Sequence, residues 1–336
     1  MLPLAVTLLT TLSGPGHTDS TLAIQPGSRL EVSNFSGQVS VSTWNRNAVH
    51  LEADHGRRTH IEFTLDGHTL KIESSGDRGV PSDVEMQITA PAWLPLDISG
   101  SMTGVEIDGS EGPIKVETVR GDVSVRGGRD YVDLSSVQGE VEVAGARGRL
   151  KLGSINSGVT VTDVIGQIDA ETVNGDIMLD GVQLDALTAS SVGGDVWFNG
   201  PMRADGRYRL ESHSGNVQVV AADAPNARLT VSTFSGEFSS DFDLAMQGEN
   251  RREKLQFTLG HGGADLSLES FSGNIQLLKS SQVAALRAQL KAQMPEKPAP
   301  ARAPRPARAP RPNRSPRPAL APTPPVAPDS PGKSID

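Results

Sequence analysis

Residues 118–125 read TVRGDVSV, and the same pattern returns as SVQGEVEV at 136–143, SINSGVTV at 154–161 and TVNGDIML at 172–179. The four copies therefore follow one another with a constant 18-residue period. The two apolar residues that close each copy are separated by one residue, so both side chains lie on the same face of a strand. A period this constant predicts stacked coils that bury their apolar faces against one another.

A second apolar series lies halfway between these copies and has the same 18-residue period: Ile114 with Val116, Val132 with Leu134, Leu150 with Leu152, and Ile168 with Ala170. Each coil therefore contains two strands, separated by turns rich in Gly, Asn and Asp. The fold class that follows is all-β, a β-solenoid of about 18-residue two-strand coils. The alternative is a β-sandwich of short hairpins, which would not require constant spacing.

The repeats are expected to occupy residues 99–279. Val196, Val217, Phe238 and Ile275 continue the first series at the wider intervals of 19, 21, 21 and 37, so the later coils carry insertions and stack in chain order. The longest interval is explained by a hairpin near 254–268 around a Gly-rich turn. Residues 21–98 show a looser strand pattern and are expected to form an N-terminal β region continuous with the solenoid.

Residues 280–294 change to helical spacing, with Val283, Leu286, Leu290 and Met294 on one face and serines available as N-cap. This short C-terminal helix is expected to cover the open end of the solenoid, where unpaired strand edges would favour aggregation. At the other end, residues 1–20 contain an apolar run too short to span a bilayer. They are interpreted as a signal peptide or a disordered start, which places the protein in the periplasm or at the cell surface.

Residues 295–336 form a basic, proline-rich tail that is expected to be disordered. They contain 14 of the 23 prolines, and their eight positive and three negative residues give +5, which leaves −14 on the rest of a chain of net charge −9. Six arginines recur every third residue, at Arg302, Arg305, Arg308, Arg311, Arg314 and Arg317. In polyproline II geometry they would form one stripe that could bind an anionic envelope polymer, a glycolipid or a membrane surface. The acidic body argues against nucleic acid as partner.

The recurring units of Ser or Thr, an apolar residue, Gly and an acid or amide lead to a resemblance. Together with Pro91-Ala92 before the repeats and the segment GGADLSLESFSGNI at 262–275, they resemble the bacterial DUF4097 family of adhesin-like β-strand repeat proteins. The resemblance covers roughly residues 25–279. It implies a β-repeat domain of the cell envelope with an adhesive role and no assigned catalytic site.

Stacking with this period places equivalent side chains in columns along the solenoid. Lys115, Asp133, Lys151 and Asp169 should alternate in charge on neighbouring strands. Thr118, Ser136, Ser154 and Thr172 should form a hydroxyl column, and Gln138, Asn156 and Asn174 an amide ladder. These polar columns are expected to make turn and ladder hydrogen bonds; the alternative is contact with carbohydrate.

Acids follow the turn glycines at Asp122, Glu140, Asp176, Asp195 and Glu237. They are expected to make local turn hydrogen bonds, although such a column could instead bind calcium or supply a catalytic acid and base. His50, His55, His60 and His68 lie close together in the sequence, but their spacing favours exposed edge positions over a metal site. The chain lacks cysteine, which excludes thiolate ligands and cysteine nucleophiles.

The sequence therefore indicates a non-enzymatic cell-envelope scaffold or adhesin-like binding protein. No catalytic residue, metal site or cofactor is predicted, and the oligomeric state is left open. A polysaccharide-active β-helix enzyme and an envelope-stress sensor are the alternatives. An enzyme would need carboxylates that converge on one groove, whereas a scaffold would show them dispersed.

Overall fold

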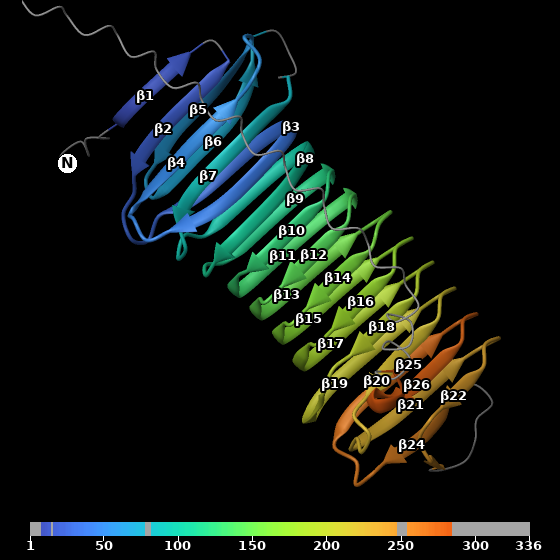
Figure 1. Cartoon of the computed structure of the whole chain (residues 1–336). Coiled ribbons are helices and arrows are strands. Elements are labelled where there is room, and N and C mark those ends of the chain that lie inside the picture. Colours follow the sequence, from blue (N-terminus) through green and yellow to red (C-terminus); the bar gives the residue numbers. More distant parts are fainter. Residues whose placement is uncertain (1–7, 15, 78–81, 247–253, 284–336) are drawn as a thin grey trace, which may run out of the picture. The chain divides into compact units, whose positions relative to one another are not determined.

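The computed structural model describes residues 8–14, 16–77, 82–246 and 254–283, and within them the fold is built almost entirely of strands. The strands of successive coils lie side by side from β8 to β20 (Figure 1). Each coil contributes one strand to a first sheet and one to a second sheet, and the long strands β3 and β8 bend so that each contributes to both.

In spatial order, the first sheet contains β5 (Thr59–Asp66), β6 (Thr69–Gly76), β3 (Arg29–Trp44), β8 (Leu96–Ser110), β9 (Ile114–Arg120), β11 (Arg129–Gln138), β13 (Arg147–Ser154), β15 (Ile165–Thr172), β17 (Gln183–Ser191), β19 (Met202–Ser212), β25 (Ala264–Ser270), β21 (Ala227–Thr233), β24 (Leu255–Leu259) and β23 (Ala245–Met246). The second sheet contains β1 (Leu8–Gly14), β2 (His17–Ala23), β4 (Ala48–Asp54), β7 (Val84–Pro91), the second halves of β3 and β8, β10 (Val123–Gly127), β12 (Val141–Ala144), β14 (Val159–Thr162), β16 (Ile177–Asp180), β18 (Val196–Asn199), β20 (Val217–Ala221), β26 (Ile275–Lys279) and β22 (Phe238–Ser240).

The 18-residue register is confirmed throughout the central coils. Val141 pairs with Val123 on one side and with Val159 on the other, and all of these ladders are parallel. Asp133 likewise lies between Lys115 and Lys151, so the alternating charges occupy adjacent strands in the expected order. Parallel pairing excludes the hairpin sandwich in this region, because hairpin neighbours are antiparallel.

One hydrophobic core runs between the two sheets. Burial alternates along each strand, and the inward residues are small and medium aliphatic side chains such as Val132, Leu134, Val141 and Val143. Phe198 and Tyr208 are the largest fully buried side chains, and their rings pack against each other with centroids 5.7 Å apart. A chain with 4% aromatic residues can fill this core because each coil leaves a thin space between its two strands.

The coils at the C-terminal end do not stack in chain order. Ile275 on β26 pairs with Val217 on β20 and with Phe238 on β22, so the last coil lies between two earlier ones. The expected order of Val217, Phe238 and Ile275 is therefore wrong. The expected hairpin near 254–268 is also wrong, because β21 lies between β24 and β25. β24 instead pairs antiparallel with β21 and covers its outer edge.

At the N-terminal end, too, the strands do not stack in chain order. β3 lies between β7 and β8, although β7 comes between them in the sequence. Antiparallel strands then extend the outermost coil, with β5 pairing with β6 and β4 pairing with β7. The N-terminal β region is thus continuous with the solenoid through β3 and β8.

The C-terminal helix begins at Ser280, and the structure describes it as far as Val283. Asp223 accepts hydrogen bonds from the Ser280 hydroxyl at 3.3 Å and from the Ser281 backbone amide at 3.2 Å, and mainly the amide bond lowers the pKa of this carboxyl. The start of the helix is therefore capped from a distant loop. The remaining residues of the predicted helix, 284–294, and the predicted tail at 295–336 lie outside the described residues.

The N-terminal segment contains β1 and β2, which pair antiparallel. Whether residues 1–20 serve as a signal peptide stays a prediction. None of the helical residues in the described ranges belongs to a helix with the length and hydropathy required to span a membrane.

Replacing Val141 by Asp tests the core. Val141 is fully buried between two neighbouring coils, so an aspartate there would place a carboxylate in the core without a partner. We expect a loss of about 3–5 kcal/mol in the free energy of unfolding, measured by urea denaturation. Glu142→Gln, on the outward face of the same strand, is the control and should change stability by less than about 0.5 kcal/mol. Equal denaturation midpoints for the two variants would contradict the assignment of this face to the core.

Candidate functional site

The corner between the two strands of each coil is held by a buried hydroxyl. Ser136, Ser154 and Ser212 donate to the backbone carbonyls of Gly121, Gly139 and Gly194 in the preceding coil, at 2.8–3.1 Å. The members of this column are buried: Thr118, Ser136, Ser154, Thr172, Ser191, Ser212 and Ser270. The expected ladder role of the hydroxyl column is confirmed, because these hydroxyls are buried and donate to backbone carbonyls.

Glycine at the corner permits this close stacking. A Cβ atom at Gly139 would lie 2.0 Å from the carbonyl oxygen of Gly121, which is the oxygen that Ser136 contacts. The hydroxyl and the glycine therefore act together, since one supplies the donor and the other lets the next backbone approach.

The acids after the corner glycines bind the next coil. Asp122 accepts a hydrogen bond from the Glu140 amide at 2.9 Å, and Asp176 accepts one from the Asp195 amide at 2.8 Å. In the amide ladder, Asn174 donates to Asn156 at 2.9 Å. These carboxylates are spread along the corner and contact backbone amides, whereas Glu140 accepts the Thr160 hydroxyl and Gly158 stands in place of an acid in the coil between Glu140 and Asp176. Within the described ranges, no cluster of three His, Asp or Glu side chains is suited to a metal ion.

An exposed, mainly apolar row runs along the same corner, and we call it the corner stripe. Its members follow the corner hydroxyls directly, in the spatial order Val119, Val137, Ile155, Val173, Val192, His213, Phe271 and Phe234; Val137 is half-buried and the others are exposed. Backbone bonds from Asn174 to Ile155 and from Gly193 to Val173 place these residues in adjacent coils. This stripe was not predicted from the sequence. The signal was present, because a hydroxyl in the core places the following residue on the outside.

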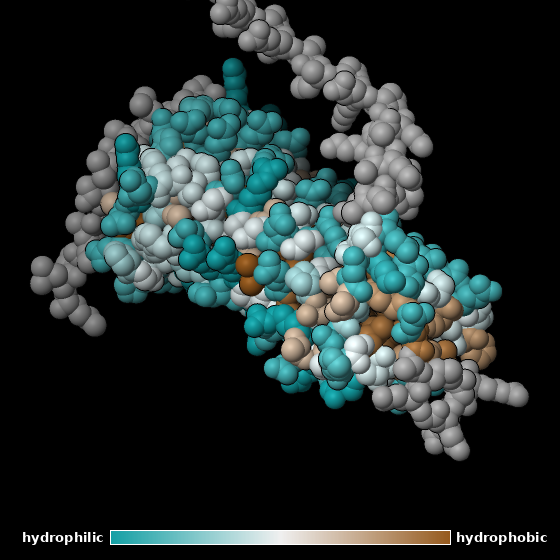
Figure 2. Space-filling view, turned by 60° about the horizontal axis from the view of Figure 1, so that its bottom comes forward, coloured by the Kyte–Doolittle hydropathy of each residue, from teal (hydrophilic) through white to brown (hydrophobic). Residues whose placement is uncertain are grey.

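The corner stripe ends in stacked rings. His213 and Phe271 lie with ring centroids 4.8 Å apart, and Phe271 and Phe234 repeat this spacing. Phe234 is 70% exposed, which is unusual for an aromatic side chain in a folded protein. On the face shown in Figure 2, hydrophobic residues gather toward the end of the molecule that carries β18–β26 in Figure 1.

A groove of about 530 Å³ runs beside the corner stripe. The corner contributes Val137, Ile155 and Val173 to it, and the first sheet contributes the small residues Ser135, Gly153 and Ser190. The groove forms because these small side chains lie lower than the glutamates at the neighbouring positions of the same column.

Acidic residues border the corner stripe on both sides. On the first-sheet side lie Glu117, Glu171, Glu211 and Glu269, and on the other side lie Asp122, Glu140, Asp176 and Asp195. Lys115 contacts Glu117 at 3.0 Å, and mainly this hydrogen bond, together with the charge of Asp97, raises the pKa of Lys115. The corner is thus an apolar row inside a negative border.

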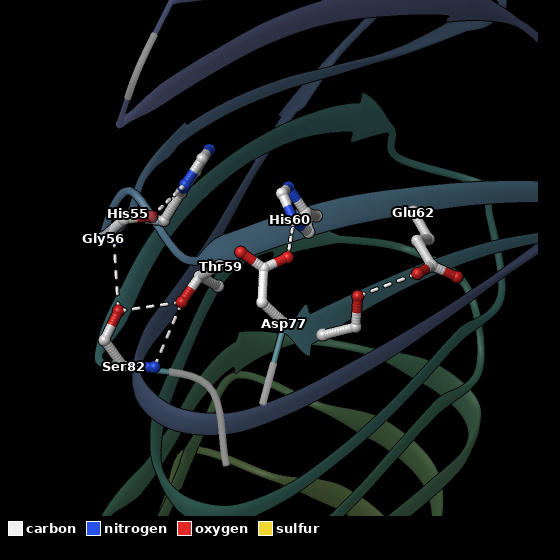
Figure 3. A network of polar contacts seen from close by, with 8 residues as sticks. His55, Gly56, Thr59, His60, Glu62, Asp77 and Ser82 are labelled. Atoms are coloured by element: carbon white, nitrogen blue, oxygen red, sulfur yellow. Dashed lines mark hydrogen bonds and ion pairs between the residues drawn. The ribbon is translucent and has the colours of Figure 1, made fainter. Parts of the chain in front are cut away.

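The histidines at the N-terminal end have separate local partners. His60 contacts Asp77, and His55 hydrogen-bonds to the backbone carbonyl of Gly56 (Figure 3). His55 also hydrogen-bonds to the Thr18 hydroxyl. His50 contacts Thr21 and Glu52. His68 is exposed in the turn between β5 and β6. These rings therefore do not converge on one point. The six predicted tail arginines, Arg302 to Arg317, lie outside the described residues.

A family model described as Toastrack DUF4097 matches residues 18–278. No curated protein matches the chain at a significant level. Among solved structures, the chain is similar to a "putative adhesin" from Parabacteroides distasonis, with 12% identity, a TM-score of 0.42, and coverage of 78% of this chain and 97% of that one. It is also similar to a "putative cell adhesion protein" from Clostridium sporogenes, with 11% identity, a TM-score of 0.23, and coverage of 79% and 100%.

The acidic column can be tested at Asp176. An asparagine there keeps an oxygen that accepts the Asp195 amide, so we expect Asp176→Asn to leave the unfolding midpoint nearly unchanged. Asp176→Ala removes the acceptor and should lower the free energy of unfolding by about 1 kcal/mol. Calorimetric titration of the native protein with calcium should give no binding heat. A heat that disappears in the asparagine variant would show that the column is a calcium site.

Proposed function

The chain belongs to the Toastrack DUF4097 family, and from this membership we propose that it is an exported, non-enzymatic binding scaffold of the cell envelope with an adhesin-like role. Its task in this proposal is to hold other envelope molecules along an extended surface. The observation that carries it is the corner stripe with its groove. Exposed apolar rows of this length mark interaction sites in soluble proteins.

The alternative of a polysaccharide-active enzyme finds less support. Glycoside hydrolysis requires two carboxyl groups that face each other across one cleft, at a separation of roughly 5–9.5 Å. The described corner acids Asp122, Asp176 and Asp195 instead follow one another coil by coil, and each accepts a backbone amide of its neighbour. Carboxylates arranged in this way stabilise the stack.

The partner of the corner stripe is proposed to be an extended polypeptide segment with apolar and basic side chains. The stripe and groove supply an apolar surface, and the two bordering rows of acids favour positive charge. The charge of −14 outside the tail acts in the same direction over longer distances. A second copy of the chain fits poorly, because it would bring like-charged borders together.

A peptide titration tests this partner chemistry. The probe is a peptide of five Lys-Val-Pro repeats, and the comparison peptide has five Lys-Ser-Pro repeats. We expect the valine peptide to bind more tightly, with an affinity that falls as salt rises. The double variant Ile155→Ser/Val173→Ser should weaken this binding at least tenfold, measured by fluorescence anisotropy.

Met178→Ser serves as the matched control, since Met178 is 49% exposed on β16 outside the corner stripe. It should bind the valine peptide like the unmodified chain. Equal binding of both peptides, or unchanged binding by the double variant, would contradict the proposal.

The basic tail adds a second proposed contact, with an anionic envelope polymer, a glycolipid or a membrane surface. The regular spacing of Arg302 to Arg317 in a proline-rich background supports it. With about 3.1 Å rise per residue, polyproline II would place one arginine roughly every 9 Å along one side. Such a row suits a polyanion.

Vesicle binding by the full chain tests the tail. We expect binding to vesicles of phosphatidylglycerol and phosphatidylcholine, none to vesicles of phosphatidylcholine alone, and a steep loss with salt. Replacing all six arginines by Gln should abolish sedimentation with the anionic vesicles. If the six-Gln variant binds as well as the unmodified chain, or if salt has no effect, the tail does not bind polyanions.

A further inference from the structure

The alternating charges on the outer face of the first sheet stop at β17. Asp97, Lys115, Asp133, Lys151 and Asp169 are consecutive neighbours in one column. The same column then continues through Thr188, Arg209, Ser267, Thr230 and Gln256, where no acid follows the arginine. At the C-terminal coils the outer surface thus changes from alternating charges to mainly neutral polar side chains, although the strand register continues.

An open depression of about 650 Å³ lies over this part of the sheet. It crosses β17, β19, β25, β21 and β24. Ala186 lies beside Arg207 in the neighbouring column, and its small side chain leaves room there. Three arginines and one aspartate line the depression, Arg207, Arg209, Arg228 and Asp265. The charge of these lining residues is therefore +2, and Glu211, which contacts Arg209 from outside the lining, reduces the local charge to +1.

The charged groups in the depression differ in their partners. Arg228 contacts Asp265 at 2.8 Å and holds the pKa of that carboxyl below its usual range. Arg209 contacts Glu211. Arg207 is in none of the ion pairs among the described residues, but it lies opposite Asp265 on β25 and its charge also lowers the pKa of that carboxyl. One guanidinium is therefore available to a ligand.

Neutral hydrogen-bonding groups complete the surface. Thr188, Ser267, Thr230 and Gln256 lie on adjacent strands, and their side chains make no hydrogen bond to another described residue. The corner hydroxyls of the same coils are buried and bonded to backbone carbonyls, as Ser212 and Ser270 show. The hydroxyls on the outer face of the sheet therefore do not connect neighbouring coils in the way that the corner hydroxyls do.

We propose that this depression binds an acidic saccharide, a sugar unit that carries a carboxylate. Arg207 would receive the carboxylate, because the planar guanidinium matches its two oxygens. Thr188, Thr230 and Gln256 would exchange hydrogen bonds with the sugar hydroxyls. The depression is open along the surface, so a sugar within a longer polymer can enter it. This inference deepens the proposed scaffold function by giving it a ligand class, and it rests on that function.

The experiment uses the full chain with all six tail arginines replaced by Gln, so that the tail contributes no polyanion binding. Polygalacturonate is the acidic probe, dextran is the neutral one, and inorganic polyphosphate separates sugar recognition from attraction to any polyanion. By calorimetry we expect binding of polygalacturonate, no binding of dextran, and weaker binding of polyphosphate than of polygalacturonate.

Arg207→Gln should lower the affinity for polygalacturonate about tenfold. Arg149→Gln is the matched control, because Arg149 is exposed in the same column but lies three coils away from Arg207. It should bind like its parent. Ala186→Gln fills the depression without a change of charge and should also weaken binding, which separates a shaped site from a diffuse positive surface.

Three results would overturn the inference: no binding of polygalacturonate, equal losses in Arg207→Gln and Arg149→Gln, or tighter binding of polyphosphate. The corner stripe is tested by its own peptide and its own variants. If polygalacturonate does not bind but the valine peptide does, the proposed scaffold function is still supported. If neither ligand binds, the scaffold function is contradicted as well.

Discussion

The hydrogen bond between the corner of one coil and the corner of the next is the interaction on which the rest of this structure depends. A Ser hydroxyl such as that of Ser154 donates to a carbonyl of the preceding coil, while Thr172 donates to Gly175 in its own turn, and the carboxylate after the glycine accepts an amide of a neighbouring coil. Both bonds require neighbouring corners to lie in register. Once the corners are aligned, the strands on either side must pair in parallel, and their apolar residues meet in one core.

The central coils could be predicted from the sequence because the residues that make these hydrogen bonds recur with a constant period. Between Thr118 and Leu179, the corner hydroxyls and the apolar pairs share the 18-residue period, so one register satisfies all of them at once. The end coils could not be ordered in this way. Residues 222–263 contain one corner unit, 233–238, but keep no constant interval, and a strand such as β26 matches β20 and β22 equally well by its apolar pattern. Which neighbour it joins depends on connections that periodicity does not describe.

The corner stripe and the arginine depression could not be predicted from the same 18-residue period. Val173 was grouped with the apolar residues of its repeat, but the buried hydroxyl of Thr172 reverses the usual assignment and places the valine outside. The arginine depression gives no repeat signal, because it arises where the repeat of outward charges ends. Conversely, the polar columns at the corner were interpreted correctly, since turn residues have local partners by default. Sequence periodicity thus reports what the coils share, while binding surfaces depend on where they differ.

The insertion of the last coil between two earlier ones has a mechanical consequence. β26 has a parallel ladder on each side, with β20 and with β22, and β25 is held in the same way by β19 and β21. A pulling force applied beyond Lys279 cannot peel this coil from an open edge, as it could peel the last turn of a simple spiral. It must shear two ladders together, and the load is shared between them. The solenoid is therefore fastened on both sides of the strand that ends at Lys279.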